Sequence, residues 1–213
     1  FNRVKSEAGS EINLLFKNSI ELRDLEFKYK NRENLIFKNL NLRINKGDYV
    51  GIYGPSGGGK TTLIGLFCGF YKPNKGKIII DGKEIRDLRK TNWLNHVSYL
   101  TQENNLIDET ILRNVTFEFD DNKVDFNLFE EVSNQSGLNK LIQKLPDKFN
   151  TEVGQKGITI SGGERQRIGI ARSLYAKKEI LIFDESTSNL DDENKLKFIE
   201  TLNELSSTKT III

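Results

Sequence analysis

The chain has 213 residues and a mass of 24.4 kDa, with 37% hydrophobic and 29% charged residues, which is typical of a globular domain and excludes a disordered chain. The formal net charge is only +2, so bulk electrostatics favour neither a nucleic-acid coat nor an acidic partner. The single cysteine, Cys68, excludes a disulfide within the chain and suits a reducing compartment.

No apolar run approaches the length of about 20 residues that a membrane-spanning helix needs, and no signal peptide is visible. The chain begins at Phe1, contains no methionine and ends within the apolar run TIII. We interpret it as a piece of a longer protein.

The first half of the chain is dominated by predicted strands. Residues 1–18 are mixed and polar, and we interpret them as a linker entering the domain. The stretches IELRDLEFKY and LNLRI alternate apolar and polar residues, which predicts two strands. DYVGIYG predicts a short strand leading into a glycine loop, and KTTLIGLFCGF predicts the helix after that loop. In KGKIIIDGKEI, the pair Asp81-Gly82 is a strong hairpin signal between two strands.

The second half mixes helices with buried strands. HVSYLTQ predicts a strand, and residues 104–148 show apolar spacings that suit short amphipathic helices. The residues that carry these spacings are Phe126, Phe129 and Val132, then Leu138, Leu141 and Ile142. EILIFDE is almost purely apolar, which is typical of a central strand in a covered parallel sheet. ENKLKFIETLNEL predicts a final helix.

A phosphate-binding loop follows the strand DYVGIYG. The segment GPSGGGKTT fits the pattern Gly-x-x-x-x-Gly-Lys-Ser/Thr and has a strand before it and a helix after it. Glycines let backbone N–H groups approach phosphate oxygens, and a helix N-terminus favours an anion. We expect Lys60 to neutralise the outer phosphates and Thr61 to offer its hydroxyl to Mg²⁺. The loop residues are Gly54, Pro55, Ser56, Gly57, Gly58, Gly59, Lys60, Thr61 and Thr62.

Two acids end the apolar strand ILIF. In a doubly wound sheet, Asp184 would leave the carboxyl end of this strand beside the phosphate loop. That position suits a carboxylate that anchors a metal. Glu185 follows and could polarise an attacking water.

A second glycine-rich helix start lies in TISGGERQRIGIARS. Ser161 supplies a hydroxyl, and Gly162 and Gly163 leave backbone N–H groups unobstructed, so this helix N-terminus also suits phosphate. One chain has no evident use for a second cradle, whereas two chains do if each brings its cradle to the other's nucleotide. Ser161 and Glu164 also have the Ser-x-x-Glu spacing of a capping box, in which Glu164 reaches back to the Ser161 N–H.

Together these motifs resemble the nucleotide-binding domain of ATP-binding-cassette (ABC) transporters, and ISGGERQR is similar to the family signature LSGGQ. The resemblance covers residues 19–213. It implies an α/β fold: a P-loop NTPase core with a mainly parallel sheet, an N-terminal antiparallel β subdomain and an inserted helical subdomain at about 103–162.

The resemblance also implies roles for further residues. Tyr29 matches an aromatic residue that stacks on adenine, although it could be an ordinary strand residue. Gln102 matches a glutamine that touches Mg²⁺ or the attacking water, although it could be a solvated strand end. STSNLD, at 186–191, is similar to a segment that crosses the dimer interface. TEVGQKG, at 151–157, is similar to the stretch that meets the membrane domains in exporters.

The chain departs from the family pattern at two places. A histidine that contacts the terminal phosphate lies downstream of the catalytic glutamate in the family, at an offset that falls just beyond Ile213. The one histidine present, His96, is interpreted as structural or solvated. Glu164 stands where glutamine is usual.

The sequence thus predicts an ATPase that binds ATP and Mg²⁺, works as a head-to-tail dimer or pseudo-dimer, and drives a membrane exporter or flippase. The transmembrane partner would be on the same chain or another, with this domain at the cytoplasmic face of a cell membrane. The alternative is a non-transport ABC ATPase acting in DNA repair, on chromosomes or on ribosomes. A single-site P-loop kinase would leave SGGERQR unexplained, and no nucleic-acid partner is expected.

Overall fold

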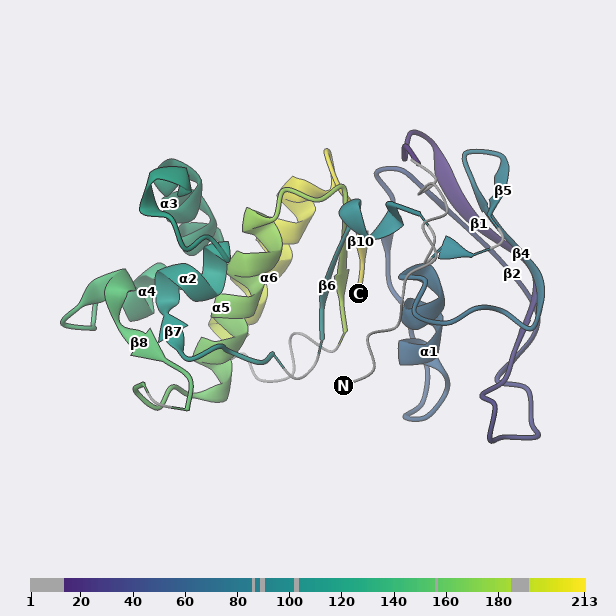
Figure 1. Cartoon of the computed structure of the whole chain (residues 1–213), viewed down its shortest axis with the longest axis horizontal. Coiled ribbons are helices and arrows are strands. Elements are labelled where there is room, and N and C mark those ends of the chain that lie inside the picture. The colour runs from purple at the N-terminus through teal and green to yellow at the C-terminus, as the bar shows by residue number, and fades with distance from the viewer. Residues whose placement is uncertain (1–13, 86, 89–90, 102–103, 156, 185–191) are drawn as a thin grey trace. The chain divides into compact units, whose positions relative to one another are not determined.

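The computed structural model describes residues 14–213 apart from 86, 89–90, 102–103, 156 and 185–191 (Figure 1). The chain divides into two compact units. The first comprises Phe1–Asp48 and Ile52–Val97, and the second comprises Tyr49–Gly51 and Ser98–Ile213. Each unit contains its own sheet and its own helices.

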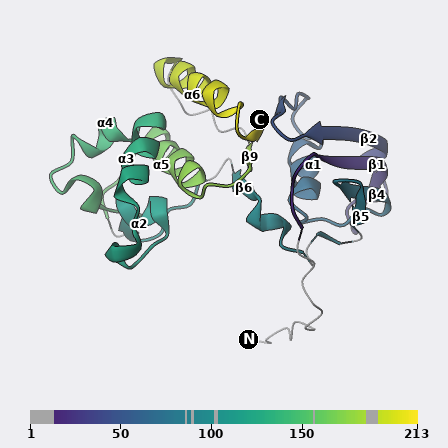
Figure 2. The same cartoon turned by 90° about the horizontal axis from the view of Figure 1, so that it is seen from above.

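The first unit is built on an antiparallel sheet with the strand order β2-β1-β4-β5. Its strands are β1 (Ser19–Phe27), β2 (Phe37–Asn45), β4 (Lys75–Ile80) and β5 (Lys83–Ile85). The helix α1 (Lys60–Phe67) lies beside this sheet in both views (Figures 1 and 2). The predicted hairpin between β4 and β5 is present, and Asp81 (φ 49°) and Gly82 (φ 79°) both adopt the left-handed backbone that its turn requires.

The segment before β1 packs into this first unit. Leu14 and Phe16 are 4% and 2% exposed, and the Phe16 ring meets the Trp93 ring edge-on at 5.6 Å. The Leu14 carbonyl accepts hydrogen bonds from Asn92 Nδ2 (3.1 Å) and His96 Nε2 (3.0 Å). Residues from Leu14 onward are therefore part of the packed unit, and His96 has the structural role that the sequence suggested.

The second unit contains a sheet with the strand order β3-β10-β9-β6. The strands are β3 (Tyr49–Val50), β6 (Val97–Leu100), β9 (Ile180–Phe183) and β10 (Thr210–Ile212), and β10 runs parallel to both β3 and β9. All four residues of β9 are buried, as the apolar run predicted for a covered strand. The long helices of this unit are α5 (Gly162–Tyr175) and α6 (Asp192–Leu205).

Short helices gather beside α5 (Figure 2). They are α2 (Ile111–Thr116), α3 (Phe126–Gln135) and α4 (Asn139–Ile142), with the 3-10 turns η3 (Asp121–Lys123) and η4 (Lys148–Asn150) and the strand pair β7 (Glu109–Thr110) and β8 (Glu152–Val153). Their apolar side chains share one buried cluster with α5, β9 and β10. Of the six residues whose spacing predicted these helices, five are buried, and Phe126 is 45% exposed at the start of α3.

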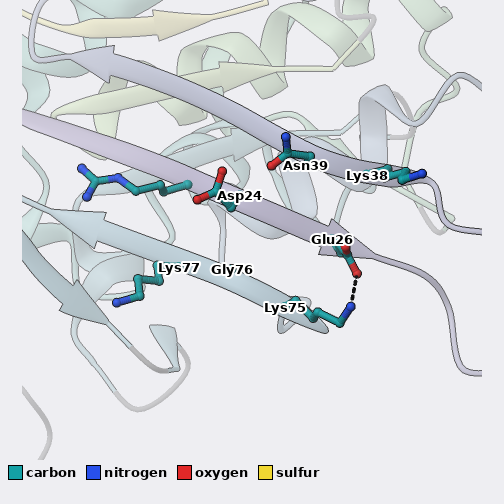
Figure 3. Close-up of a pocket in the computed structure, with 8 residues that line it drawn as sticks. Asp24, Glu26, Lys38, Asn39, Lys75, Gly76 and Lys77 are labelled. Carbon is teal, nitrogen blue, oxygen red and sulfur yellow. Dashed lines mark ion pairs between the residues drawn. The ribbon is translucent and has the colours of Figure 1, made fainter.

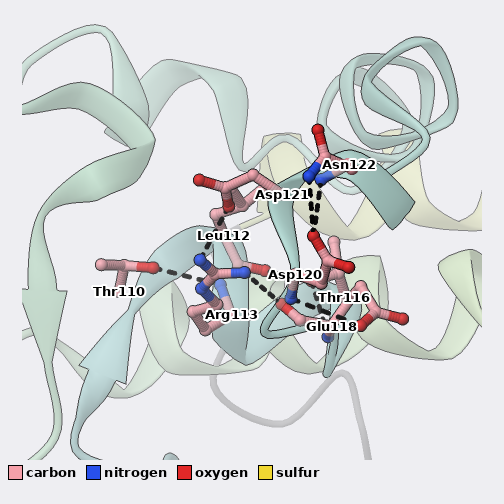
Figure 4. A network of polar contacts seen from close by, with 8 residues as sticks. All are labelled: Thr110, Leu112, Arg113, Thr116, Glu118, Asp120, Asp121 and Asn122. Atoms are coloured by element: carbon pink, nitrogen blue, oxygen red, sulfur yellow. Dashed lines mark hydrogen bonds and ion pairs between the residues drawn. The ribbon is translucent and has the colours of Figure 1, made fainter.

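The turn after α2 is organised by one arginine (Figure 4). The Arg113 guanidinium pairs with Asp121 at 2.7 Å, donates to the Glu118 carbonyl and lies 5.9 Å from the centre of the Phe119 ring. Thr110 caps α2 by accepting the Arg113 N–H at 3.2 Å. These contacts join the start of α2 to η3 and so hold the loop between them.

Candidate functional site

The glycine loop before α1 has the geometry of an anion cradle. Gly57 (φ 76°) and Gly59 (φ 93°) adopt left-handed backbone, and Gly59 is the N-cap of α1 with no side chain bonded to the free amides. The Lys60 Nζ atom lies 3.0 Å from the Gly54 carbonyl and 3.1 Å from the Pro55 carbonyl, so its ammonium group arches over the loop. Uncapped helix amides beside a fixed cation are the donors that a phosphate group needs.

Gly59 is required at its position for two reasons. Its φ of 93° is strained for any other residue. A Cβ atom built there would lie 2.9 Å from Ile36 Cγ2 and 3.1 Å from Phe37 Cζ. The segment that follows Tyr29 therefore packs directly on the loop, and residues 32–36 with Gly57 and Gly58 line a cavity of about 450 Å³.

Tyr29 lies beside the first turn of α1. Its hydroxyl oxygen is 2.9 Å from Thr62 Oγ1, and its ring contacts Phe27 and Tyr71 edge-on at 5.2 and 5.4 Å. The structure thus brings the expected base-stacking residue next to the expected phosphate helix. Thr61 is exposed on the same turn, whereas Thr62 is 6% exposed.

Asp184 follows β9 in the second unit and is 8% exposed. Its backbone N–H donates to the Leu100 carbonyl at 3.0 Å, and the Tyr99 hydroxyl donates to its Oδ2 at 3.1 Å. Two contacts from β6 therefore fix the carboxylate at the end of its strand, as a metal-anchoring acid requires. The expected water-polarising Glu185, the segment 186–191 and Gln102 lie outside the described residues.

The second cradle begins α5 with a complete capping box, as the Ser-x-x-Glu spacing predicted. Ser161 Oγ accepts the Glu164 N–H at 3.3 Å, and Glu164 Oε2 accepts both the Ser161 N–H and the Ser161 hydroxyl at 2.8 Å. Ser161 and Gly162 are exposed, and Gly163 and Glu164 are half-buried. Because Glu164 binds both the hydroxyl and the backbone N–H of Ser161 at the start of α5, this acid is part of the cradle.

A further cavity, of about 490 Å³, lies on the sheet of the first unit (Figure 3). Three of its four cations are in ion pairs: Lys75 with Glu26 (3.0 Å), Lys77 with Glu84 (2.8 Å) and Arg23 with Glu21 (2.9 Å). A surface on which opposite charges already pair is an ordinary solvated sheet face. The glycine loop is therefore the stronger candidate.

The ABC transporter family model matches residues 37–188 of the chain, a range that contains the glycine loop, Asp184 and the second cradle. The chain belongs to the ABC transporter family. It is an ATP-binding, ATP-hydrolysing domain of that family, with the α/β P-loop NTPase fold that the sequence predicted.

Several relatives resemble this ABC domain closely. ABC transporter B family member 29, chloroplastic, of Arabidopsis thaliana is 39% identical over 91% of the chain and 31% of its own length. The alpha-hemolysin translocation ATP-binding protein HlyB of Escherichia coli O157:H7 is 37% identical over 99% of the chain and 30% of its own length. A bacterial Atm1-family ABC exporter with ATP bound has a TM-score of 0.86 and 31% identity, covering 95% of this chain and 35% of that one.

The chain spans about a third of the length of the curated relatives named above: 31% of the Arabidopsis thaliana protein and 30% of HlyB. Among the described residues, no helix has the length and apolar character to cross a bilayer. Of the two functional classes that the sequence left open, the relatives support the transporter and not the DNA-repair, chromosome or ribosome-associated ATPase.

The contacts between Asn104 and the helix α5 of this ABC domain were not predicted from the sequence. Asn104 is 9% exposed; its Nδ2 donates to the Arg165 carbonyl at 2.6 Å and its Oδ1 accepts from Arg172 at 3.1 Å. A Cβ atom at Gly169, in the middle of α5, would lie 2.6 Å from Asn104 Cγ and 2.7 Å from Leu100 Cδ1. Asn104 therefore joins the signature helix to the loop after β6. A glycine inside a predicted helix was the one available signal.

Burial shifts the pKa of two side chains, Arg172 and Cys68. It lowers the pKa of the Arg172 guanidinium, which lies 4.7 Å from the centre of the Phe117 ring and donates to the Asn114 carbonyl at 2.7 Å. It raises the pKa of the Cys68 thiol to about 12. Cys68 is therefore a packing residue and not a nucleophile.

Proposed function

We propose that this ABC domain is the motor of a membrane exporter or flippase and that it works as a head-to-tail dimer at the cytoplasmic face of a membrane. The observation that carries the proposal is the presence of two anion cradles of different construction, one uncapped with a lysine and one capped by Ser161 and Glu164. A single nucleotide bound by one chain would leave the second cradle without a ligand. The names of the relatives, which describe translocation and export, support the transport role.

The first cradle would hold the phosphates of ATP. The amides of Gly57, Gly59 and Lys60 and the Lys60 ammonium would donate to the phosphate oxygens. The Gly58 N–H already donates to the Pro55 carbonyl at 3.0 Å and so shapes the loop. The Tyr29 ring would lie under the adenine. Gly54, Pro55, Ser56, Gly57, Gly58, Gly59, Thr61 and Thr62 complete this binding region.

The donors also fit Mg²⁺. The exposed Thr61 hydroxyl and the buried Asp184 carboxylate are hard oxygen ligands of the kind that Mg²⁺ prefers. When bound, Mg²⁺ would neutralise charge on the phosphates. Tyr99 would keep Asp184 oriented for this task, and Gln102 would contribute a further oxygen.

Hydrolysis needs a water aligned with the terminal phosphate. We assign its polarisation to Glu185, which directly follows the metal-anchoring Asp184. In the dimer, the Gly162 and Gly163 amides of one chain would contact the terminal phosphate held by the other. The Ser161 hydroxyl would join them by exchanging its bond to Glu164 for one to the phosphate. Loss of that phosphate would remove the contact, and the dimer would open.

The stretch 151–157, expected to meet membrane helices, lies beside residues 108–111, which directly follow the other stretch expected there, 103–107. β7 pairs with β8, the Ile111 N–H donates to the Thr151 carbonyl at 3.0 Å, and the Gln155 N–H donates to Asp108 Oδ1. A movement of α5 would reach these stretches through Arg172 and Asn104.

The head-to-tail arrangement is tested by mixing two inactive variants. A Lys60→Ala chain has no working first cradle, and a Ser161→Arg chain has no working second cradle, so each homodimer lacks both complete sites. A mixed dimer would contain one complete site, built from the Lys60 of one chain and the Ser161 of the other. We expect ATP hydrolysis to reappear on mixing.

The control is a Lys60→Ala/Ser161→Arg double variant mixed with Lys60→Ala, which offers no complete site. If mixing the single variants restores no hydrolysis while the wild-type chain is active under the same conditions, the two cradles do not act on one nucleotide.

A further inference from the structure

We propose that the hydroxyl groups of Tyr29 and Thr62 form a relay that directs the Thr62 proton toward the phosphates of the bound nucleotide. The inference rests on the proposed binding of ATP at the first cradle and adds a role for the Tyr29 hydroxyl that does not involve the base. Tyr29 is then a positioning residue that acts through Thr62, and Tyr71 holds the Tyr29 ring in place by packing.

The three hydroxyl-bearing side chains are held together by packing. Tyr29 and Tyr71 meet edge-on at 5.4 Å, both contact the buried Phe27 ring, and the Tyr29 hydroxyl lies 2.9 Å from Thr62 Oγ1. Tyr71 is seated on α1 itself, because a Cβ atom at Gly65 would lie 2.5 Å from Tyr71 Cε2. The cluster therefore has little freedom relative to the helix that begins at the glycine loop.

The direction of the hydrogen bonds follows from the acidity of the groups. A phenol (pKa about 10) is a stronger donor than an aliphatic hydroxyl, so Tyr29 donates to Thr62. Thr62 Oγ1 thus accepts from Tyr29, and the Thr62 proton is left for another acceptor.

Thr62 is the end of this chain of donors. Among the described residues, its hydroxyl has no hydrogen-bond partner other than Tyr29, so its own proton is left for an incoming acceptor. Thr62 is the third residue of α1 and is 6% exposed, within the turn whose amides are uncapped. A hydroxyl that already accepts one bond becomes a better donor, and a phosphate oxygen at this turn would be its acceptor.

A ligand that has phosphates but no base distinguishes the relay from stacking of the Tyr29 ring on adenine. Tyr29→Phe keeps the ring and removes the hydroxyl. We expect inorganic tripolyphosphate and ATP to bind this variant about three- to tenfold more weakly than the wild-type chain, the scale of one neutral hydrogen bond. Isothermal titration calorimetry measures both affinities. Stacking alone would leave tripolyphosphate binding unchanged.

Two further variants test whether Tyr29 acts through Thr62 and whether the effect is specific to this hydroxyl. Thr62→Val removes the relay's last member, and the affinity of Tyr29→Phe/Thr62→Val should equal that of Thr62→Val, because the tyrosine acts only through the threonine. Tyr175→Phe is the matched control: its hydroxyl bonds the Asp125 N–H at 3.0 Å in the second unit, and its loss should leave tripolyphosphate affinity unchanged.

The outcomes distinguish the relay from the function on which it rests. If the wild-type chain binds neither ATP nor tripolyphosphate, the proposed nucleotide site fails. If the wild-type chain binds both and Tyr29→Phe binds tripolyphosphate equally or more tightly, the relay is wrong and the site stands. Additive losses in the double variant would also overturn the relay, since they would show that Tyr29 acts independently of Thr62.

Discussion

Replacing Glu164 with glutamine separates two effects of this residue: it caps α5 in the free domain, and it would place a negative charge near the partner's ATP in the dimer. In the free domain, Glu164 Oε2 accepts two hydrogen bonds from Ser161, both at 2.8 Å, at the positive end of the 14-residue helix α5. In the proposed closed dimer, the same carboxylate would stand near the phosphates of the partner's ATP. Glutamine keeps an acceptor oxygen but removes the charge.

The expected cost to the free domain is small. Loss of the charge removes the helix-dipole contribution of about 0.3–1 kcal/mol, while most of the capping geometry is kept. For a domain of this size, a change of about 1 kcal/mol moves the Tm by about 2–4 °C. We therefore expect Glu164→Gln to lower the Tm of the ATP-free chain by about 1–4 °C.

The expected effect on dimerisation has the opposite sign. Two unit charges about 4 Å apart in water repel by about 1 kcal/mol, which corresponds to about a fivefold change in an equilibrium constant. Removing the carboxylate should therefore lower the ATP concentration needed for half-maximal dimerisation by up to about fivefold at low salt. At about 1 M salt the Debye length falls to about 3 Å, and the difference should largely disappear.

Size-exclusion chromatography across an ATP titration measures the dimer fraction, with both chains also carrying Glu185→Gln so that ATP persists. Glu130→Gln, which removes an exposed acid from α3, is the matched charge control. If the Glu164→Gln chain dimerises no better than its parent at low salt, Glu164 faces away from the nucleotide and acts only as a cap.

Four further predictions concern single residues. Lys60→Ala should abolish ATP binding or weaken it severely, as measured by calorimetry, because it removes the cation above the loop; unchanged affinity would exclude the assigned site. Glu185→Gln should keep ATP binding and slow hydrolysis by at least about 10²-fold, and a wild-type rate would refute its role. Burial by itself raises the pKa of Asp81, but hydrogen bonds from backbone N–H groups and the charge of Lys46 lower the pKa overall. The ionised Asp81 carboxylate therefore stabilises the fold near neutral pH, and this stabilisation is lost as the pH falls through the lowered pKa. Asp81→Asn should therefore reduce the Tm at pH 7 and weaken its dependence on acid pH, whereas an unchanged acid profile would contradict this account. Gly169→Ala should destabilise the fold by about 1–3 kcal/mol in urea titrations, because its methyl group would displace Asn104; wild-type stability would show that Asn104 moves freely.

Residues close together in the chain determined much of the site. The uncapped start of α1, the turn at Asp81-Gly82 and the box between Ser161 and Glu164 each depend on residues within four positions of one another. Glycine's tolerance of positive φ and the reach of a side chain across one helical turn are local properties. They follow from the residue types in order, whatever surrounds them.

The tertiary structure alone decided the contacts between distant segments. The bond between Tyr29 and Thr62 joins residues 33 positions apart, and the bond between Asn104 and Arg172 joins residues 68 positions apart. Neither pairing has a local signal, because a tyrosine or an asparagine is compatible with many surroundings. Which hydroxyl or amide each one meets is set by how the hydrophobic clusters of its unit pack, and that packing depends on every apolar side chain in the cluster at once.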